Sequence, residues 1–297
     1  MAQFAKSTFS HASYAAFRPS YPPSLYQIIM KYHQGPKSLC VDLGSGHGVV
    51  AREFASFFDR VIGTDPSSGM IQQARSLTSA DEYPNVTYEQ ASAENMPFLT
   101  HQGVDTVVSG QAAHWFDPEE FFPEMKRVVR KGGTLAFWCY KDHVFVDYPR
   151  ATRILDRYCY GEEERMLGPY WQQPGRNKVQ NKLRDLRPPE DEWTDIQRIE
   201  YEPSIKGPKS GEGTMFLSKR MTLGVCMNYI RTWSAFGGWQ EKFPQLRKRE
   251  DGGSGDVIDE MFDEMVQSEP DWATCSDWKS KEVDIEWGSG LVLARKN

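Results

Sequence analysis

The chain has 297 residues, of which 39% are hydrophobic and 26% are charged, and its net charge is −6. This apolar content is enough for a full core, so the composition excludes wholesale disorder. No stretch reaches the roughly 20 apolar residues that cross a bilayer, and residues 1–20 lack the apolar run that we would expect of a secretory signal. The acidic balance argues against a general binder of nucleic acid or anionic membranes.

Cysteine usage points to a reducing compartment. Five cysteines occur, and none belongs to a CxxC pair or to a cluster with zinc-ligand spacing. Cys40 and Cys139 lie inside apolar runs, where a thiol behaves as a small buried hydrophobe. We therefore expect reduced structural thiols, a cytoplasmic location and no metal.

The first half of the sequence alternates between strand-like and helical patterns. Apolar runs predict five strands, over residues 38–43, 60–65, 86–90, 104–109 and 134–140. Helical spacing follows the first run over residues 49–58, and a second helix is expected from Pro66. A third helix is expected to begin at the capping Asp117 and to end at the basic turn before Gly132. Apolar strands that alternate with helices indicate a parallel sheet covered on both faces.

The second half is less regular. A sixth strand is expected near residues 196–203. A last strand is expected over residues 283–296, with an interruption at the Gly-Ser-Gly sequence of residues 288–290. Between these two strands, the sequence predicts a helix over residues 221–239, a solvated loop over 240–256 and a short helix over 258–266. The expected fold class is α/β, with a Rossmann-like, mostly parallel sheet of seven strands, helices on both faces and a helical cap from the C-terminal half.

Residues 41–48, with the sequence VDLGSGHG, carry the clearest indication of function. A predicted strand ends there in three glycines at alternate positions, namely Gly44, Gly46 and Gly48. Such a turn lets a ligand approach the backbone and directs the start of the next helix toward it. Asp65 closes the second strand 23 positions after Asp42, near the spacing at which an acid grips a ribose diol.

Other nucleotide-binding turns fit these residues less well. A P-loop requires Gly-Lys-Ser/Thr, which does not follow, and the dinucleotide fingerprint GxGxxG differs from alternating glycines. Asp42 also places a negative charge at the turn itself. That charge suits a cationic or amine-bearing ligand better than a pyrophosphate.

These motifs over residues 38–140 resemble those of class I S-adenosylmethionine-dependent methyltransferases. In that family the glycine turn faces the methionyl end of the cofactor, and the acid after the second strand binds both ribose hydroxyls. The resemblance implies S-adenosylmethionine as cofactor, S-adenosylhomocysteine as product and no metal. It assigns cofactor contacts to Asp42, Gly44, Gly46, Gly48 and Asp65.

The resemblance also implies cofactor contacts further along the chain. Residues 91–98 match the family motif that lines the adenine, although Ser92 departs from the acidic residue often found there. The expected contacts in that motif are Ala93 and Glu94. Met70 is expected to pack on the adenine, or it belongs only to the core face of its helix. Gln111 opens the segment after the fourth strand, where the family places residues that touch cofactor and substrate.

A narrower resemblance extends over nearly the whole chain. The sequence is similar to the fungal trans-aconitate methyltransferases and to their sister, the yeast cantharidin methyltransferase. The segments that carry this similarity are residues 14–22, 61–68, 114–117, 167–171, 173–176 and 229–234.

We expect one methyltransferase domain with four kinds of segment. These are an N-terminal lid segment (1–36), an S-adenosylmethionine-binding core (37–140), cap insertions (141–195 and 204–280) and final sheet strands (196–203 and 283–296).

A carboxylate acceptor would be ionised at pH 7 and would need no general base, so its site must chiefly hold an anion with arginine and hydroxyl donors. Arg18 is the first candidate, with a surface salt bridge as the alternative. Arg231 lies on an aromatic-rich predicted helix and either lines the acceptor pocket or caps a helix face. The other expected substrate contacts are Tyr14, Tyr21, His114, Trp115, Tyr170, Trp171 and Trp233.

Two of these candidates have more than one interpretation. Tyr170 and Trp171 lie between Gly-Pro and Pro-Gly breaks, as expected of a lid turn, or they form a buried aromatic anchor. His114 is the tentative catalytic residue. It would act as a base for a hydroxyl acceptor, as a donor to a carboxylate, or only as a packing partner of Trp115.

The resemblance therefore predicts a methyltransferase that acts on a small molecule, with a methyl ester of a trans-aconitate-like di- or tricarboxylic acid as the leading product. The alternative is a fungal secondary-metabolite O- or C-methyltransferase for a phenol, an enol or a polyketide acid. A nucleic-acid enzyme fits less well, because basic and acidic residues are interspersed. An inactive module fits less well because the glycines and Asp65 are present. We expect no nucleic-acid or membrane partner, and a monomer or homodimer.

Overall fold

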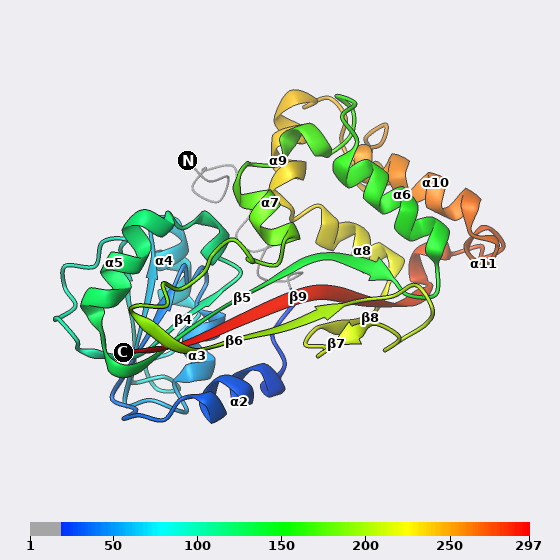
Figure 1. Ribbon diagram of the computed structural model, residues 1–297. Coiled ribbons are helices and arrows are strands. Elements are labelled where there is room, and N and C mark those ends of the chain that lie inside the picture. The colour runs from blue at the N-terminus through cyan, green and yellow to red at the C-terminus, as the bar shows by residue number, and fades with distance from the viewer. Residues whose placement is uncertain (1–18) are drawn as a thin grey trace. The chain divides into compact units, whose positions relative to one another are not determined.

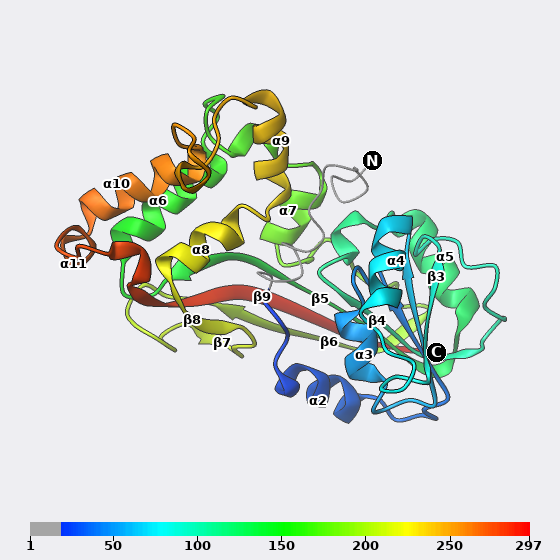
Figure 2. The same ribbon diagram turned by 180° about the vertical axis from the view of Figure 1, so that it is seen from behind.

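The computed structural model describes residues 19–297 (Figures 1 and 2). These residues form two compact units. The sheet unit comprises residues 20–141, 174–201 and 289–297, and the helical unit comprises residues 142–173 and 202–288. Of the predicted cap segments, residues 142–173 and 204–280 belong to the helical unit, and residues 141 and 174–195 belong to the sheet unit. Tyr14 and Arg18 lie outside the described residues.

Five parallel strands form the centre of the sheet unit, in the order β3-β2-β1-β4-β5. Their bounds are β1 (Leu39–Leu43), β2 (Arg60–Asp65), β3 (Val86–Gln90), β4 (Val104–Gly110) and β5 (Val129–Phe145). The direction of winding reverses between β1 and β4. Ligands of open α/β sheets bind outside the carboxyl ends of the strands at such a switch point. The predicted α/β class is confirmed.

The sheet continues with antiparallel strands from the C-terminal half, giving nine strands among residues 19–297 where seven were predicted. The added strands are β6 (Trp193–Glu202), β7 (Glu212–Gly213), β8 (Ser218–Thr222) and β9 (Glu282–Lys296). Strand β9 runs without a break through residues 288–290, contrary to expectation. A side chain on Gly290 would bring a Cβ within 2.8 Å of the Lys182 carbonyl oxygen, so this glycine permits a close approach and does not end the strand.

Each face of the sheet has its own helices (Figure 1). Val41 and Leu43 belong to a core cluster with Phe121 and Met125 of α5 (Pro118–Val128). The opposite face carries α2 (Pro23–Tyr32) and α3 (Val49–Phe54), joined by an edge contact between Tyr26 and Phe54 at 5.5 Å between ring centroids. Helix α4 (Ser68–Ser76) follows β2. Burial of each such side chain contributes roughly 1.5–3 kcal/mol.

The predicted start of α5 is confirmed, whereas its predicted end is too late. The Asp117 carboxylate caps the helix by accepting the Glu119 N–H at 3.1 Å. The helix ends at Val128, and β5 begins at once with Val129. The basic turn before Gly132 therefore lies in a strand, and β5 runs from Val129 to Phe145 where the apolar run predicted only residues 134–140.

The helical unit contains most of the remaining helices. They are α6 (Pro149–Tyr160), α8 (Leu223–Ile230), α9 (Ser234–Lys242), α10 (Val257–Ser268) and α11 (Pro270–Ala273). The single helix predicted over 221–239 is wrong: strand β8 ends at Thr222, and two helices follow with a break at residues 231–233. Thr222 caps α8 by accepting the Val225 N–H at 3.3 Å. The sheet unit also carries the short helix α7 (Gly175–Gln180).

Candidate cofactor site and acceptor region

The three glycines after β1 all adopt left-handed backbone angles, with φ of 64° at Gly44, 54° at Gly46 and 85° at Gly48. A side chain at Gly44 would collide with the Cβ of Ala112, and one at Gly48 would collide with the Tyr88 hydroxyl. No described atom lies within 4 Å of the place where a Gly46 Cβ would stand. Gly44 and Gly48 are therefore needed to close the turn, whereas Gly46 leaves open space at its surface.

Asp65 ties this turn to the end of β2. Its Oδ2 accepts the Gly46 N–H at 3.0 Å, and its Oδ1 accepts the Ser67 N–H at 2.8 Å. The side chain is buried, with 9% of the residue exposed. The glycine turn and the end of β2 thus meet beside the open space at Gly46, although Gly46 and Asp65 are 19 positions apart in the sequence.

Asp42 is a carboxylate without ordinary hydrogen bonds. The residue is 1% exposed, and neither carboxylate oxygen has a hydrogen-bond partner among the described residues. Burial raises the pKa of Asp42 well above its usual value, the nearby Asp65 raises it further, and the Ala51 N–H and Arg52 act in the opposite direction. A buried carboxyl group with spare acceptor capacity fits the ammonium of an amino acid, as the methionyl end of S-adenosylmethionine presents.

Gln111 joins the end of β4 to β5. Its Nε2 donates to the Tyr140 carbonyl at 2.9 Å, and its Oε1 accepts the Tyr140 N–H at 2.7 Å. Its backbone is left-handed, with φ of 58°. These contacts direct the chain toward Ala112, which lies against Gly44. The geometry gives Gln111 a positioning role, and its contact with the cofactor stays a prediction.

The three remaining cofactor candidates lie on two segments of the sheet unit. Met70 is 4% exposed in the first turn of α4, and its N–H donates to the Ser67 hydroxyl at 3.3 Å. Ala93 is 5% exposed within the core cluster on the α5 face. A Glu94 carboxylate oxygen accepts the Asp117 N–H at 3.2 Å. Contacts of these three residues with an adenine stay predictions.

The loop after β4 carries two acceptor candidates in a short 3-10 helix, η2 (Ala113–Trp115). The His114 and Trp115 rings lie 4.6 Å apart, and Trp115 is 38% exposed. Gly175, the first residue of α7, packs against both rings, so that a Cβ there would stand 3.2 Å from each of them.

Helix α7 also contains a cationic residue, Arg176, that we did not single out from the sequence. Arg176 follows Gly175 directly, and its Nε is buried. Lys178 fixes the helix to this loop by donating to the Phe116 carbonyl at 3.0 Å. The signal for Arg176 was available, because it ends one of the segments, 173–176, that carry the narrower family resemblance.

Tyr21 is the described part of the predicted N-terminal substrate segment. Its ring packs edge-on against Trp138 at 5.3 Å and lies 6.3 Å from Tyr140, both on β5. Tyr21, His114 and Trp115 therefore all belong to the sheet unit.

The aromatic candidates of the helical unit are anchored within it. The Tyr170 hydroxyl donates to the Glu164 carbonyl at 2.8 Å. The Trp171 Nε1 donates to the Cys159 carbonyl at 2.8 Å, and its ring lies 5.6 Å from that of Trp233. Both residues are half-buried, and the lid-turn and buried-anchor interpretations of Tyr170 and Trp171 both stay predictions.

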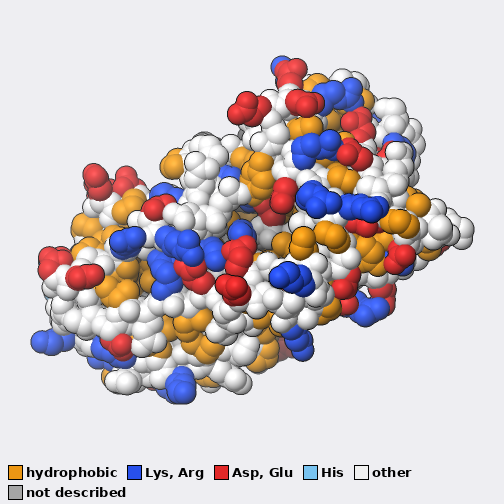
Figure 3. Space-filling model, turned by 45° about the vertical axis from the view of Figure 1, so that its right-hand side comes forward, with side chains coloured by type: hydrophobic (Ala, Val, Ile, Leu, Met, Phe, Trp, Pro, Cys, Tyr) orange, Lys and Arg blue, Asp and Glu red, His pale blue; other side chains and the backbone are white. Residues whose placement is uncertain are grey.

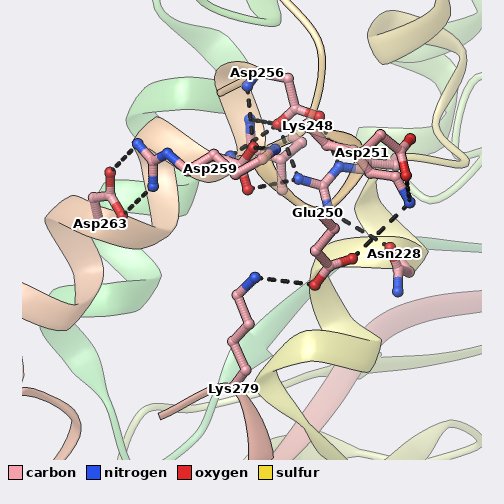
Figure 4. A network of polar contacts seen from close by, with 11 residues as sticks. Asn228, Lys248, Glu250, Asp251, Asp256, Asp259, Asp263 and Lys279 are labelled. Carbon is pink, nitrogen blue, oxygen red and sulfur yellow. Dashed lines mark hydrogen bonds and ion pairs between the residues drawn. The ribbon is translucent and has the colours of Figure 1, made fainter. Parts of the chain in front are cut away.

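Arg231 belongs to a polar network of the helical unit. Figure 4 shows this network, with Asp256 and Asp259 labelled. The Arg231 guanidinium forms a two-pronged ion pair with Asp256 at 2.7 and 3.0 Å and bonds Asp259 at 2.9 Å. The side chains of both acids are almost completely buried, and that of Arg231 is 10% exposed. The structure therefore favours the helix-capping interpretation of Arg231, because its charge is already matched inside the chain.

The same network reaches the predicted solvated loop over 240–256, whose residues 240–254 are exposed or half-buried as expected. Residues 249–251 form a 3-10 helix, η4 (Arg249–Asp251), and the Arg249 N–H donates to Asp259 at 3.0 Å. Asp256 caps α10 by accepting the Ile258 and Asp259 N–H groups at 3.0 and 2.9 Å. The exposed charged side chains of this stretch also form ion pairs, such as the one between Arg249 and Asp263.

Residues 19–297 lack two kinds of feature, a metal-ligand cluster and a membrane-spanning helix. No three His, Cys, Asp or Glu side chains come together there as ligands for a metal ion. None of the helices in this part of the chain has the length and apolar character to cross a bilayer.

Comparison with known proteins identifies the family. Residues 41–137 match the model of a methyltransferase domain. The chain is 31% identical over 296 residues to the Saccharomyces cerevisiae protein named "Probable S-adenosylmethionine-dependent methyltransferase CRG1", covering 97% of this chain and 96% of the yeast protein. It is 26% identical over 204 residues to the methyltransferase cfoB of Aspergillus candidus, covering 64% and 63% of the two chains.

A solved structure supports the same assignment over nearly the whole chain. It is described as a "Putative Type II Methyltransferase" from Anaeromyxobacter dehalogenans, and it superposes with a TM-score of 0.67 at 26% identity, covering 94% of this chain and 98% of that one. The glycine turn, Asp42 and Asp65 fit the cofactor that these relatives imply. The chain belongs to the S-adenosylmethionine-dependent methyltransferases.

Proposed function

We propose that the enzyme methylates a carboxylate oxygen of a small di- or tricarboxylic acid, such as trans-aconitate, to give a methyl ester. When bound, S-adenosylmethionine supplies a methyl group on a positively charged sulfur. The acceptor's carboxylate oxygen forms the new O–C bond as the C–S bond breaks. No proton moves, so the protein has to position the acceptor and exclude water.

The observation that carries this proposal is the position of Arg176. Contacts link the glycine turn to Ala112, and the loop that continues to His114 and Trp115 packs on Gly175. Arg176 therefore directly follows the glycine that packs on this loop, which comes after the carboxyl end of β4. A guanidinium binds carboxylates through two parallel hydrogen bonds, which suits a polycarboxylate acceptor. His114 would serve as a second donor.

The mixed charge of the surface supports a small acceptor rather than a nucleic acid. On the face in Figure 3, Lys and Arg side chains are interspersed with Asp and Glu, and no continuous basic stripe crosses it.

A hydroxyl-bearing planar acceptor, such as a phenol, an enol or a polyketide acid, is the second candidate function. Trp115 is 38% exposed beside His114, and such a pair would stack a planar acceptor while the imidazole takes its proton. This reaction requires the base, whereas ester formation does not.

The test is a methyl-transfer assay that follows S-adenosylhomocysteine release. Trans-aconitate, related di- and tricarboxylates, phenols and polyketide acids would be offered to the full chain. We expect turnover of polycarboxylates to a product that alkali hydrolyses back to the acid. Turnover of phenols alone, with loss of activity in His114→Gln, would establish the second candidate instead.

Arg176→Gln tests the proposed carboxylate contact. Loss of a charge-assisted hydrogen bond should raise the KM for the polycarboxylate about 10- to 100-fold and leave S-adenosylhomocysteine affinity unchanged. Arg187→Gln is the matched control, because that exposed guanidinium donates to the Arg184 carbonyl at 3.0 Å. Equal kinetics for the two variants would remove Arg176 from the site.

A further inference from the structure

Helix α7 ends in a turn whose backbone angles its residues do not favour. The Leu183 N–H donates to the Lys178 carbonyl at 2.8 Å, and the Lys182 N–H donates to the Val179 carbonyl at 2.9 Å. These two bonds form a Schellman motif, in which the left-handed residue is usually glycine. Here that residue is Lys182, with φ of 52°, and Leu183 after it has φ of 59°. Two successive left-handed residues with side chains cost free energy, so other contacts must hold the turn.

Arg198 on β6 supplies such contacts. Its Nη1 donates to the Lys182 carbonyl at 3.0 Å, and its Nη2 donates to the Leu183 carbonyl at 3.1 Å. One guanidinium therefore bonds both left-handed residues of the turn. The Arg198 side chain is 27% exposed, so these bonds are partly shielded from water. The rigid, planar fork of five N–H donors makes this arrangement specific to arginine.

Glu200 and Gly290 also fix the turn to the sheet. Lys182 is 6% exposed, and its Nζ lies 3.2 Å from a Glu200 carboxylate oxygen on β6. Glu200 lies 3.7 Å from the Arg198 guanidinium as well. A Cβ on Gly290 of β9 would come within 2.8 Å of the Lys182 carbonyl oxygen, so the two backbones are in close contact. Residues that are distant in the sequence thus hold the end of α7.

The start of α7 packs against the loop after β4. Gly175 lies against the His114 and Trp115 rings, and the Lys178 Nζ donates to a backbone carbonyl of this loop at 3.0 Å. Helix α7 is only six residues long. Because so short a helix moves as one piece, a shift of its C-terminal turn also moves Gly175 and Arg176.

We propose that Arg198 is a positioning residue for acceptor binding, which acts through the turn at Lys182 and Leu183 and does not touch the acceptor. It holds α7, which carries Arg176, against the loop of His114 and Trp115. This inference rests on the proposed function, in which Arg176 contacts the acceptor. Loss of the Arg198 fork weakens acceptor binding, whereas the bound acceptor reacts at its usual rate and the cofactor site is unaffected.

Steady-state kinetics of Arg198→Gln in the full chain test the proposal. The acceptor is trans-aconitate, or the phenol or polyketide acid that is turned over in its place. We expect the KM for the acceptor to rise about tenfold, because hydrogen bonds to a charged group are lost. The kcat and the affinity for S-adenosylhomocysteine should stay unchanged.

Arg184→Gln is the matched control. The Arg184 Nε donates to a Glu200 carboxylate oxygen at 2.9 Å, and its side chain is 51% exposed. This variant removes an ion pair with the same acid but leaves both Arg198 bonds to the turn in place, so it should keep the wild-type KM. A wild-type KM in Arg198→Gln, or an equal rise in Arg184→Gln, would overturn the proposal.

Hydrogen exchange reports on the turn without any acceptor. The Lys182 and Leu183 amides are hydrogen-bonded within the turn, and Arg198→Gln should speed their exchange about 10- to 100-fold. Unchanged exchange and KM in Arg198→Gln, beside a raised KM in Arg176→Gln, would overturn this inference alone. Faster exchange with a wild-type KM in both variants would overturn the proposed function as well and leave Arg198 a purely structural role.

Lys182→Gly shows whether Arg198 acts through the turn. Glycine adopts left-handed angles without strain, so the turn needs less support from Arg198 in this background. Arg198→Gln should then raise the KM by less than about threefold, compared with about tenfold in the wild-type background. An equal rise in the two backgrounds would mean that Arg198 acts by another route, contrary to the proposal.

Arg198→Lys guards against a variant that fails to fold because it lacks a charge beside Glu200. Lysine keeps the charge but cannot reproduce the planar fork. We expect its KM to rise as in Arg198→Gln, while wild-type affinity for S-adenosylhomocysteine shows that the chain is folded. A wild-type KM in Arg198→Lys would mean that the charge matters and the fork does not, and it would overturn the proposal.

Discussion

Asp42 of the sheet unit and Arg231 of the helical unit differ in whether other residues satisfy their buried polar groups. In the sheet unit, Asp42 is buried without hydrogen-bond partners among the described residues, and Gly46 leaves open space beside Asp65. In the helical unit, Arg231 is matched by Asp256 and Asp259. Unsatisfied buried groups indicate a surface built for a ligand, whereas satisfied groups indicate a surface built for stability. The comparison separates two residues, Asp42 and Arg231, that were both site candidates by sequence.

Replacing Arg231 is the strongest test of this contrast. Arg231→Ala leaves Asp256 and Asp259 buried without their cation, so the free energy of unfolding should fall by about 3–5 kcal/mol. Arg249→Gln is the matched control, because the Arg249–Asp263 pair is exposed and should contribute less than about 1 kcal/mol. Urea denaturation measures both. A stable Arg231→Ala variant with a raised acceptor KM would return Arg231 to the substrate site.

A buried histidine of the helical unit should make that unit sensitive to acid. His143 lies within 4.9 to 6.1 Å of the Phe145, Tyr229, Trp233 and Trp287 rings. Its Nε2 lies 3.4 Å from the Cys226 sulfur, and burial lowers its pKa to about 4, with Asp142 opposing that effect.

The sign of the expected effect follows from this lowered pKa. The unfolded chain binds a proton below about pH 6.5, whereas the folded chain keeps His143 neutral down to about pH 4. The free energy of unfolding should therefore fall by about 3 kcal/mol between pH 6.5 and 4. His143→Gln does not titrate and should flatten this part of the profile. Equal profiles for the two proteins would place the acid-sensitive group elsewhere.

Two glycine substitutions give a smaller and more local contrast within the sheet unit. Gly48→Ala places a methyl group against the Tyr88 hydroxyl and should cost about 2 kcal/mol of stability. Gly46→Ala meets no described atom within 4 Å, so only its left-handed backbone opposes it, at about 1 kcal/mol. Its main effect should be on cofactor binding. Thermal unfolding measures the loss of stability, and S-adenosylhomocysteine calorimetry measures the loss of cofactor binding. Tight cofactor binding by Gly46→Ala would mean that the cofactor does not occupy the open space beside Gly46.

The sequence by itself determined the alternation of strands and helices over residues 38–128 and the glycine turn. These features depend on local rules, because apolar periodicity, capping and left-handed glycines act over a few neighbouring residues. The class of enzyme followed from the same motifs.

Only the tertiary structure decided which polar groups have partners. Arg231 and Asp256 are 25 positions apart, and Tyr26 and Trp138 are 112 positions apart. No local sequence pattern therefore reveals the ion pair between the first two or the ring contact between the other two. The same holds for Gly290, whose close approach to Lys182 keeps β9 continuous where the sequence predicts a break. Hydrogen-bond satisfaction depends on contacts between distant segments, and here it separates the candidate ligand site from the network that stabilises the helical unit.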